Sequence, residues 1–294
     1  MKRWALILGI IVALVTIGWM VFVPQATAPT GPPGYVLDEA SESEVVPDGT
    51  STVPRVSVVA ENLEIPWEVL FLPDGEILVT ERPGTVVFLR AGVEVEIEHI
   101  TATGEGGLLG AALHPEFATN GLLYLYETSE SENGLVNRIN RYVVDGTTLT
   151  FDRTIIDELP GARYHDGGRI AFGPDGLLYA TVGDATRADE AQDLVTLEGT
   201  IIRVTADGEI PAENPFDTAV YSFGHRNPQG LAWDLTGNLW STEHGRSVPL
   251  SGFDELNLIQ PGGNYGWPEV QGDEVLEGAI QPVRHSGPNV TWAP

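Results

Sequence analysis

A histidine and an aspartate at the two ends of a predicted β-hairpin are the residues best placed to do chemistry. His165 comes just before the apolar run 170–172 and Asp184 just after the run 177–182, with the turn Gly-Pro-Asp-Gly at 173–176 between the runs. Apolar runs on both sides of such a turn are typical of a hairpin. Because a tight hairpin brings its open ends together, the imidazole and the carboxylate could form an oriented general base. The alternative is a surface hydrogen bond without a catalytic role.

Two further stretches precede predicted strands and could contribute to the same site. The stretch 224–230, Gly-His-Arg-Asn-Pro-Gln-Gly, contains Arg226 and Asn227. A guanidinium supplies planar, permanently charged donors for a carbonyl or a developing oxyanion, although an arginine can also hold a loop by bonding backbone carbonyls. The stretch 104–110, Gly-Glu-Gly-Gly-Leu-Leu-Gly, contains Glu105, and its glycines would let the backbone approach a flat ligand.

Adjacent carboxylates at Asp254 and Glu255 indicate a possible site for a hard cation such as calcium, which takes oxygen ligands. In a chain with 42 acidic residues, two acids are weak evidence taken alone. The sequence contains no run that matches the helix-loop-helix calcium motif, the serine nucleophile elbow, a phosphate loop or a dinucleotide fingerprint.

The elements that must position these residues follow one pattern of strand, turn and strand that occurs four times. Each copy has a turn glycine: Gly75, Gly121, Gly176 and Gly237. The intervals of 46, 55 and 61 residues, which leave room for weaker outer strands such as 86–89 and 200–204, are typical of propeller blades. We therefore expect an all-β propeller with about four to five blades; the alternative is a β-sandwich. The sequence ends within what resembles a further strand, so we expect the last one or two blades to be missing.

Composition excludes several classes of protein. The 294 residues carry a formal charge of −27, with 42 acidic against 15 basic side chains, and Lys2 is the only lysine. Such a surface repels phosphate backbones, so we expect no nucleic-acid partner; strongly acidic surfaces also occur in proteins that work at high salt. The absence of cysteine excludes disulfides, thiolate metal sites and cysteine nucleophiles.

The N-terminal region differs in composition from the rest. Residues 1–23 combine Lys2 and Arg3 with an apolar run that is long enough to span a bilayer, which predicts a signal peptide or an uncleaved membrane anchor. Residues 24–54 are rich in Pro, Gly, Ser and acids, which predicts an extended linker. Residues 55–294 would form the propeller, located outside the cytoplasm and either secreted or anchored to the membrane.

Seven motifs in order resemble the soluble PQQ-dependent glucose/sorbosone dehydrogenases, in particular the aldose sugar dehydrogenase branch. The motifs lie at 104–110, 165–170, 173–179, 183–184, 224–231, 254–259 and 262–268. The resemblance covers roughly residues 55 to 294. It implies a six-bladed propeller that holds pyrroloquinoline quinone (PQQ) and calcium in its axial cleft, oxidises aldose sugars to lactones and passes electrons to an external acceptor.

The resemblance also assigns roles to individual residues. His165 resembles the general base, Asp184 the carboxylate that orients it, and Arg226 the group that stabilises the oxygen of the reducing quinone. Asn227 would contact the cofactor, as would the position of Glu105. The carbonyls of Gly245 and Arg246 would hold the catalytic calcium, and Asp254, Glu255 and the Tyr265 carbonyl resemble a structural calcium site.

Three departures from the family pattern bear on function. Glu105 stands where the family usually has glutamine, which adds negative charge near a polyanionic cofactor. Tyr164 precedes the base where glucose-active members have an acid, and the family's basic cofactor ligands would fall beyond Pro294. Two rival functions stay open: a calcium-dependent propeller lactonase, and a non-catalytic propeller that binds glycans or a partner protein.

Overall fold

The computed structural model describes residues 57–247 and 252–291. The predicted N-terminal segment 1–23 and linker 24–54 lie outside the described residues, so both remain predictions. Within the described ranges, no helix is long and apolar enough to cross a membrane.

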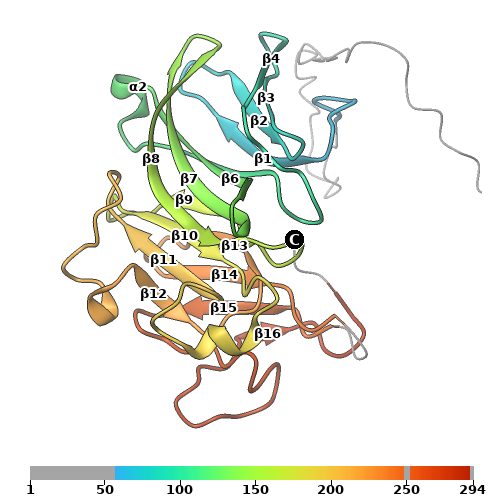
Figure 1. Cartoon of the computed structure of the whole chain (residues 1–294), viewed down its shortest axis with the longest axis vertical. Coiled ribbons are helices and arrows are strands. Elements are labelled where there is room, and N and C mark those ends of the chain that lie inside the picture. The colour runs from blue at the N-terminus through green and yellow to red at the C-terminus, as the bar shows by residue number, and fades with distance from the viewer. Residues whose placement is uncertain (1–56, 248–251, 292–294) are drawn as a thin grey trace, which may run out of the picture. The chain divides into compact units, whose positions relative to one another are not determined.

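The described chain forms four antiparallel four-stranded sheets, coloured blue to red in sequence order in Figure 1. The first sheet contains β1 (Pro66–Phe71), β2 (Ile77–Glu81), β3 (Thr85–Phe88) and β4 (Val93–Glu96). The second contains β5 (Leu108–Leu113), β6 (Leu122–Ser131), β7 (Gly134–Asp145) and β8 (Thr148–Pro160). The third contains β9 (Ile170–Phe172), β10 (Leu178–Val182), β11 (Thr200–Val204) and β12 (Val220–Phe223). The fourth contains β13 (Pro228–Trp233), β14 (Leu239–Glu243), β15 (Glu255–Ile259) and β16 (Arg284–His285).

Each sheet is a meander in which consecutive strands are neighbours, as in a propeller blade. The four predicted blades are thereby confirmed within the described residues, and we call the sheets blades 1 to 4. The connections contain little helix: α2 (Phe117–Asn120) and the 3₁₀ helices η1 (Ala188–Gln192) and η2 (Pro215–Asp217).

An aspartate sets the first turn in three blades. Asp74, Asp175 and Asp234 each accept a hydrogen bond from the backbone N–H two residues later, at 3.0, 3.1 and 2.8 Å. This local bond closes an Asx turn and leaves the following glycine to take a positive φ. In blade 2 the helix α2 replaces the turn. The repeated sequence pattern therefore corresponds to the hairpin between the first two strands of every blade.

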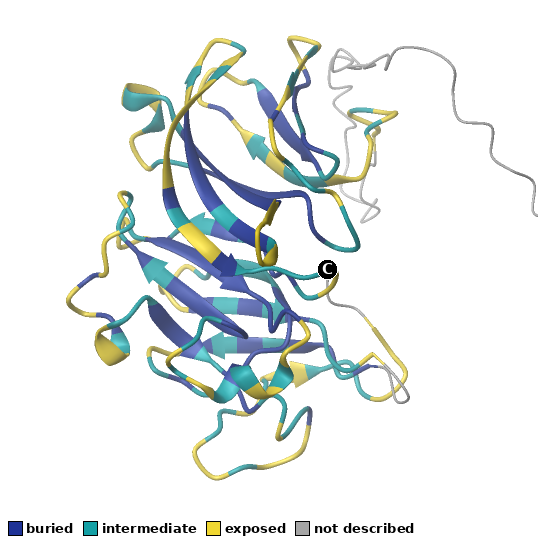
Figure 2. Cartoon of the chain, viewed as in Figure 1, coloured by how far each residue is buried: buried dark blue, intermediate teal, exposed yellow. Residues whose placement is uncertain are grey.

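The blades pack face to face through alternating side chains. Along β6, Leu123 and Leu125 join a core with blade 1, whereas Tyr124 and Tyr126 join a core with blade 3. A third core, which includes Tyr179 and Leu239, lies between blades 3 and 4. Because side chains alternate across a strand, a strand between two blades must be apolar on both faces. Figure 2 accordingly shows the middle strands as dark blue, buried segments.

The first strands of the blades come together, with β1 against β5 and β5 against β9. Arg169, just before β9, donates a hydrogen bond to the carbonyl of Gln229 on β13 at 2.9 Å and forms an ion pair with Glu68 on β1. Its guanidinium also lies 4.1 Å from the centre of the Trp67 ring. One side chain therefore links blades 1, 3 and 4 where their first strands meet.

Candidate active site

The blade 3 hairpin brings His165 and Asp184 together as the sequence predicts. The Nδ1 atom of His165 lies 2.7 Å from Oδ1 of Asp184, and both side chains are largely buried. A carboxylate only accepts, so Nδ1 carries a proton, and in the neutral ring Nε2 presents its lone pair. In the described part of the chain, Nε2 has no hydrogen-bond partner. The pair therefore has the arrangement of an oriented general base.

The backbone at His165 takes an unusual conformation. Its φ of 64° lies in the left-handed region, which is uncommon for a side-chain-bearing residue and is found at functional sites. Its N–H donates to Oε2 of Glu105 at 2.8 Å, and its carbonyl accepts from the N–H of Ala185 at 3.2 Å. A β-carbon at Gly183 would overlap this carbonyl, so only glycine allows the two ends of the hairpin to approach this closely.

Asp184 accepts three N–H donors, of which the sequence predicts only His165. Oδ1 accepts from Thr186 N–H at 2.7 Å in addition to the histidine, and Oδ2 accepts from the indole Nε1–H of Trp267 at 2.8 Å. Trp267 lies 83 residues further along the chain. Trp267 belongs to the motif at 262–268, so the resemblance includes this residue, but the sequence gives no indication that it contacts Asp184.

Arg226 and Asn227 lie beside the dyad. The backbone N–H of Asp184 donates to the Arg226 carbonyl at 2.8 Å, which joins the two loops. Asn227 accepts from the N–H of Gly167 at 3.0 Å and donates to Glu105 at 3.2 Å. Glu105 thus bonds both the backbone of the base and the amide of Asn227. The structure brings these five predicted residues into one connected network: His165, Asp184, Glu105, Arg226 and Asn227.

Arg226 is buried, with 6% of its surface exposed. It donates to Oγ of Ser247 at 2.8 Å and to the His244 carbonyl at 3.4 Å, but among the described residues no carboxylate lies within ion-pair distance. Burial lowers the pKa of Arg226, whereas the nearby Asp184 raises it. A buried cation bonded only to neutral groups is well suited to receive an anionic ligand.

The predicted calcium residues divide into two groups. Asp254 accepts a hydrogen bond from the Gly245 N–H at 2.9 Å, and the Arg246 carbonyl accepts from Gly252 N–H at 3.1 Å. Glu255 instead accepts from Gly272 N–H at 2.9 Å, since neighbouring residues at the start of a strand point in opposite directions. The two adjacent carboxylates therefore bond different groups.

Buried oxygen atoms surround Glu255. Burial raises the pKa of both Glu255 and its neighbour Glu243 on β14, and their two carboxyl groups interact. The carbonyl oxygens of the Asn257 and Gln271 side chains are buried without a hydrogen-bond partner. Acceptors in excess of donors suit a cation with oxygen ligands. The described residues contain no group of three His, Asp or Glu side chains arranged to hold a metal, so a ligand set here would need backbone or amide oxygens.

Two uncharged rings, those of Tyr265 and His225, pack next to Glu243. The Tyr265 ring stacks on the His225 ring at a centroid distance of 4.6 Å, and its hydroxyl donates to the Leu258 carbonyl at 2.6 Å. His225 is fully buried between Glu243 and Ser222, at 2.9 Å from each. Burial lowers the pKa of His225 to about 3, so its contact with Glu243 is a hydrogen bond to a neutral ring.

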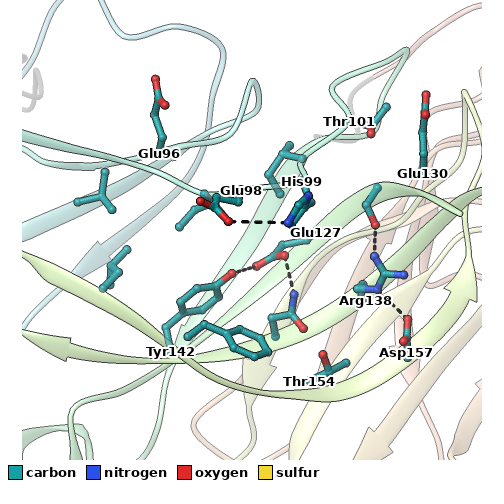
Figure 3. A pocket seen from close by; sticks show the side chains of 17 residues that line it. Glu96, Glu98, His99, Thr101, Glu127, Glu130, Arg138, Tyr142, Thr154 and Asp157 are labelled. Atoms are coloured by element: carbon teal, nitrogen blue, oxygen red, sulfur yellow. Dashed lines mark hydrogen bonds and ion pairs between the residues drawn. The ribbon is translucent and has the colours of Figure 1, made fainter.

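A cavity of about 960 Å³ lies between the β4–β5 connection and strands β6 to β8 (Figure 3). It contains none of the residues predicted for the site. At its base, the Tyr142 hydroxyl donates to Glu127 at 2.8 Å and the Asn140 amide donates to the same carboxyl group at 2.6 Å. Burial raises the pKa of Glu127 to about 7.

Comparison with known proteins identifies relatives along most of the chain. Residues 63–293 match the family model described as glucose/sorbosone dehydrogenase. Aldose sugar dehydrogenase YliI of Escherichia coli is 34% identical over 261 residues, which are 78% of this chain and 69% of that protein. Quinoprotein glucose dehydrogenase B of Acinetobacter calcoaceticus is 36% identical over 255 residues, 73% of this chain and 52% of that protein.

A solved structure agrees with these matches. The PQQ-bound form of aldose sugar dehydrogenase from Streptomyces coelicolor superimposes with a TM-score of 0.71 at 41% sequence identity. The match covers 81% of this chain and 71% of that one. Sequence and fold therefore agree, and the chain belongs to the glucose/sorbosone dehydrogenase family.

Proposed function

We propose that this protein is a quinoprotein sugar dehydrogenase that oxidises the anomeric carbon of an aldose to a lactone. The observation that carries the proposal is the His165–Asp184 dyad, whose Nε2 is free of partners in the described residues and which lies next to the buried cation of Arg226. The similarity to an aldose sugar dehydrogenase and to a quinoprotein glucose dehydrogenase supports it.

His165 acts as the general base in this proposal. Its Nε2 takes the proton of the anomeric hydroxyl, and Asp184 holds the ring in the tautomer that leaves Nε2 unprotonated. As the positive charge develops on the imidazole, the carboxylate 2.7 Å from Nδ1 stabilises it. Removal of the hydroxyl proton makes hydride release from the same carbon easier, because electron density on the oxygen moves toward the carbonyl being formed.

The site has donors that fit PQQ. When bound, this planar anionic quinone supplies the acceptor for the hydride. Arg226, buried and bonded only to neutral groups, and the amide of Asn227 would hold it. The glycines of 104–110 allow the backbone to come close. Glu105 adds a negative charge. Its carboxylate already accepts hydrogen bonds from two N–H donors, the backbone of His165 and the amide of Asn227, which stabilise that charge.

Calcium is the second proposed cofactor. The carbonyls of Gly245 and Arg246 would hold the ion beside the cofactor. Around Glu255, the unpaired buried oxygens of Asn257 and Gln271 favour a second, structural ion that the Tyr265 carbonyl would help to coordinate. Calcium suits both places because it accepts neutral oxygen ligands in irregular geometry.

Three broader features complete the proposal. The whole propeller has six blades, in keeping with the family resemblance. The protein works outside the cytoplasm, either secreted or attached to the membrane through residues 1–23, which is supported by the apolar run there. It passes its electrons to an external acceptor.

Reconstitution with PQQ and calcium tests the function. We expect the protein to reduce a redox dye when an aldose is added, and His165→Ala to lower kcat/KM by about 10³-fold or more. His99→Ala is the matched control, because this exposed histidine makes no contact with the site. Lactone hydrolysis that needs metal alone and is unaffected by PQQ would support the lactonase instead. If PQQ changes neither activity nor melting temperature, the non-catalytic alternative gains support.

A further inference from the structure

Trp267 contacts two groups of the proposed site, the carboxylate of Asp184 and the guanidinium of Arg226. Its indole N–H donates to Oδ2 of Asp184 at 2.8 Å, and the guanidinium of Arg226 lies 5.5 Å from the centre of its ring. The residue is in the connection between β15 and β16 of blade 4, whereas the dyad belongs to blade 3. One side chain from a neighbouring blade therefore touches the carboxylate that orients the base and the cation beside it.

The backbone of Trp267 is fixed independently of the dyad. Its N–H donates to the Gly224 carbonyl at 2.9 Å, and its carbonyl accepts from the Gln192 side chain at 2.7 Å. Gln192 on η1 and Asn264 exchange two amide hydrogen bonds, at 3.0 and 2.8 Å. Because the N–H and the carbonyl of Trp267 are both hydrogen-bonded to other parts of the chain, the position of its indole relative to Asp184 does not depend on the dyad.

This contact distinguishes the two oxygens of Asp184. With Oδ2 bonded to the indole, the carboxylate cannot rotate freely, and Oδ1 stays directed at His165 Nδ1 and Thr186 N–H. A carboxylate held by Oδ1 alone could turn about its χ2 torsion, which is broad and weakly restrained. The imidazole would then lose the fixed orientation that proton transfer requires.

We propose that Trp267 is a positioning residue for the His165–Asp184 dyad, acting through its indole N–H. This inference rests on the proposed function, since it assumes that His165 is the base. The indole N–H also disperses part of the negative charge on Asp184. Without it, more charge remains on the carboxylate beside the imidazole, which favours the protonated ring. A protonated ring cannot accept the proton of the substrate.

Trp267→Phe is the decisive variant, because it keeps an aromatic ring near Arg226 and removes the N–H donor; the loss of ring volume that accompanies it is matched in the control. We expect kcat/KM to fall by about tenfold to a hundredfold and the low-pH limb of the rate profile to move to higher pH. Trp240→Phe is the matched control. Its indole N–H also donates to an aspartate, Asp234 at 3.1 Å, in the turn before β14, and its loss should change neither quantity.

A double-mutant cycle tests the route of the effect. In an Asp184→Asn background, Trp267→Phe should cost less than about threefold, because its partner carboxylate is already gone. An effect of undiminished size in that background would overturn the proposal, as would an unchanged rate and pH profile in the single variant.

A spectroscopic measurement separates this inference from the proposed function. In the cofactor-free protein, the proton on Nδ1 of His165 should give a sharp, strongly downfield NMR signal that broadens or disappears in Trp267→Phe and persists in Trp240→Phe. If the wild-type protein oxidises no sugar but the signal behaves in this way, the proposed function fails and the positioning contact stands. If the signal is unaffected by Trp267→Phe, the positioning role is wrong whatever the activity.

Discussion

Replacing Glu127 by glutamine should make the protein more stable at neutral and alkaline pH. Glu127 is on β6 and has 4% of its surface exposed, at the base of the cavity in Figure 3. Its carboxyl group accepts from Tyr142 and Asn140, neither of which carries a charge. A buried carboxylate bonded only to neutral donors costs free energy whenever it is ionised.

The pKa of Glu127 gives the size of this cost. Burial raises the value from its ordinary 4.5 to about 7. Between these two pH values the folded protein keeps a proton on Glu127 that the unfolded chain has lost, so the contribution of Glu127 to stability is greatest below pH 4.5 and decreases as the pH rises to about 7. At about 1.4 kcal/mol per pH unit, the full loss is about 3 kcal/mol.

Glutamine can keep a hydrogen bond to each of the two neutral partners of the carboxyl group. The Oδ1 atom of Asn140 is buried and has no partner, whereas its amide nitrogen donates to Glu127. In the variant, rotation of the Asn140 amide would let Oδ1 accept from the new side-chain NH₂ group. The glutamine oxygen would accept from the Tyr142 hydroxyl, which stays protonated because burial raises its pKa.

Thermal unfolding of both proteins across pH 4 to 9 measures the effect. We expect equal melting temperatures near pH 4.5 and an advantage for Glu127→Gln that grows to about 6 °C or more at pH 8 and above. Glu130→Gln is the control, since Glu130 is exposed on the rim of the same cavity and should give no such trend. A variant that is less stable than the wild type at pH 8, or a difference independent of pH, would refute the reasoning.

Two further predictions concern the active site. Asp184→Asn should lower kcat/KM by about 10³-fold to 10⁴-fold with little change in melting temperature, because the amide no longer fixes the tautomer of His165; steady-state kinetics with an aldose and a dye measure this. Chelation of calcium should lower the melting temperature and abolish any stabilisation by PQQ, and restored calcium but not magnesium should recover both, as followed by thermal unfolding with and without PQQ.

The hairpins and the dyad could be predicted from sequence because their determinants are local. The turn aspartates and glycines define the blades, as at Asp175 and Gly176, where a side-chain bond reaches only two residues along the chain. His165 and Asp184 follow from the same hairpin, since antiparallel pairing of β9 with β10 fixes which ends meet. The prediction that they share one sheet edge is confirmed by their 2.7 Å contact.

The contacts between blades could not be predicted in this way. Trp267 reaches Asp184 across 83 residues, and Glu105 reaches the backbone of His165 across 60. Each contact depends on how one sheet packs against the next. The alternation of apolar residues shows that the sheets pack together, but it does not determine which side chains meet. Sequence likewise places Asp254 and Glu255 side by side, whereas the strand directs their carboxylates to Gly245 and Gly272.

The charges around Arg226 explain why calcium should be linked to cofactor binding. Asp184, Glu105 and Asp254 are among the acids whose charges act on its guanidinium. One buried cation facing several carboxylates leaves this region with an excess of negative charge, in a chain whose net charge is already −27. An anionic quinone would increase that excess, because burial weakens solvent screening. A divalent ion bound to neutral carbonyls adds two positive charges without another carboxylate, so it can offset the charge that the quinone brings.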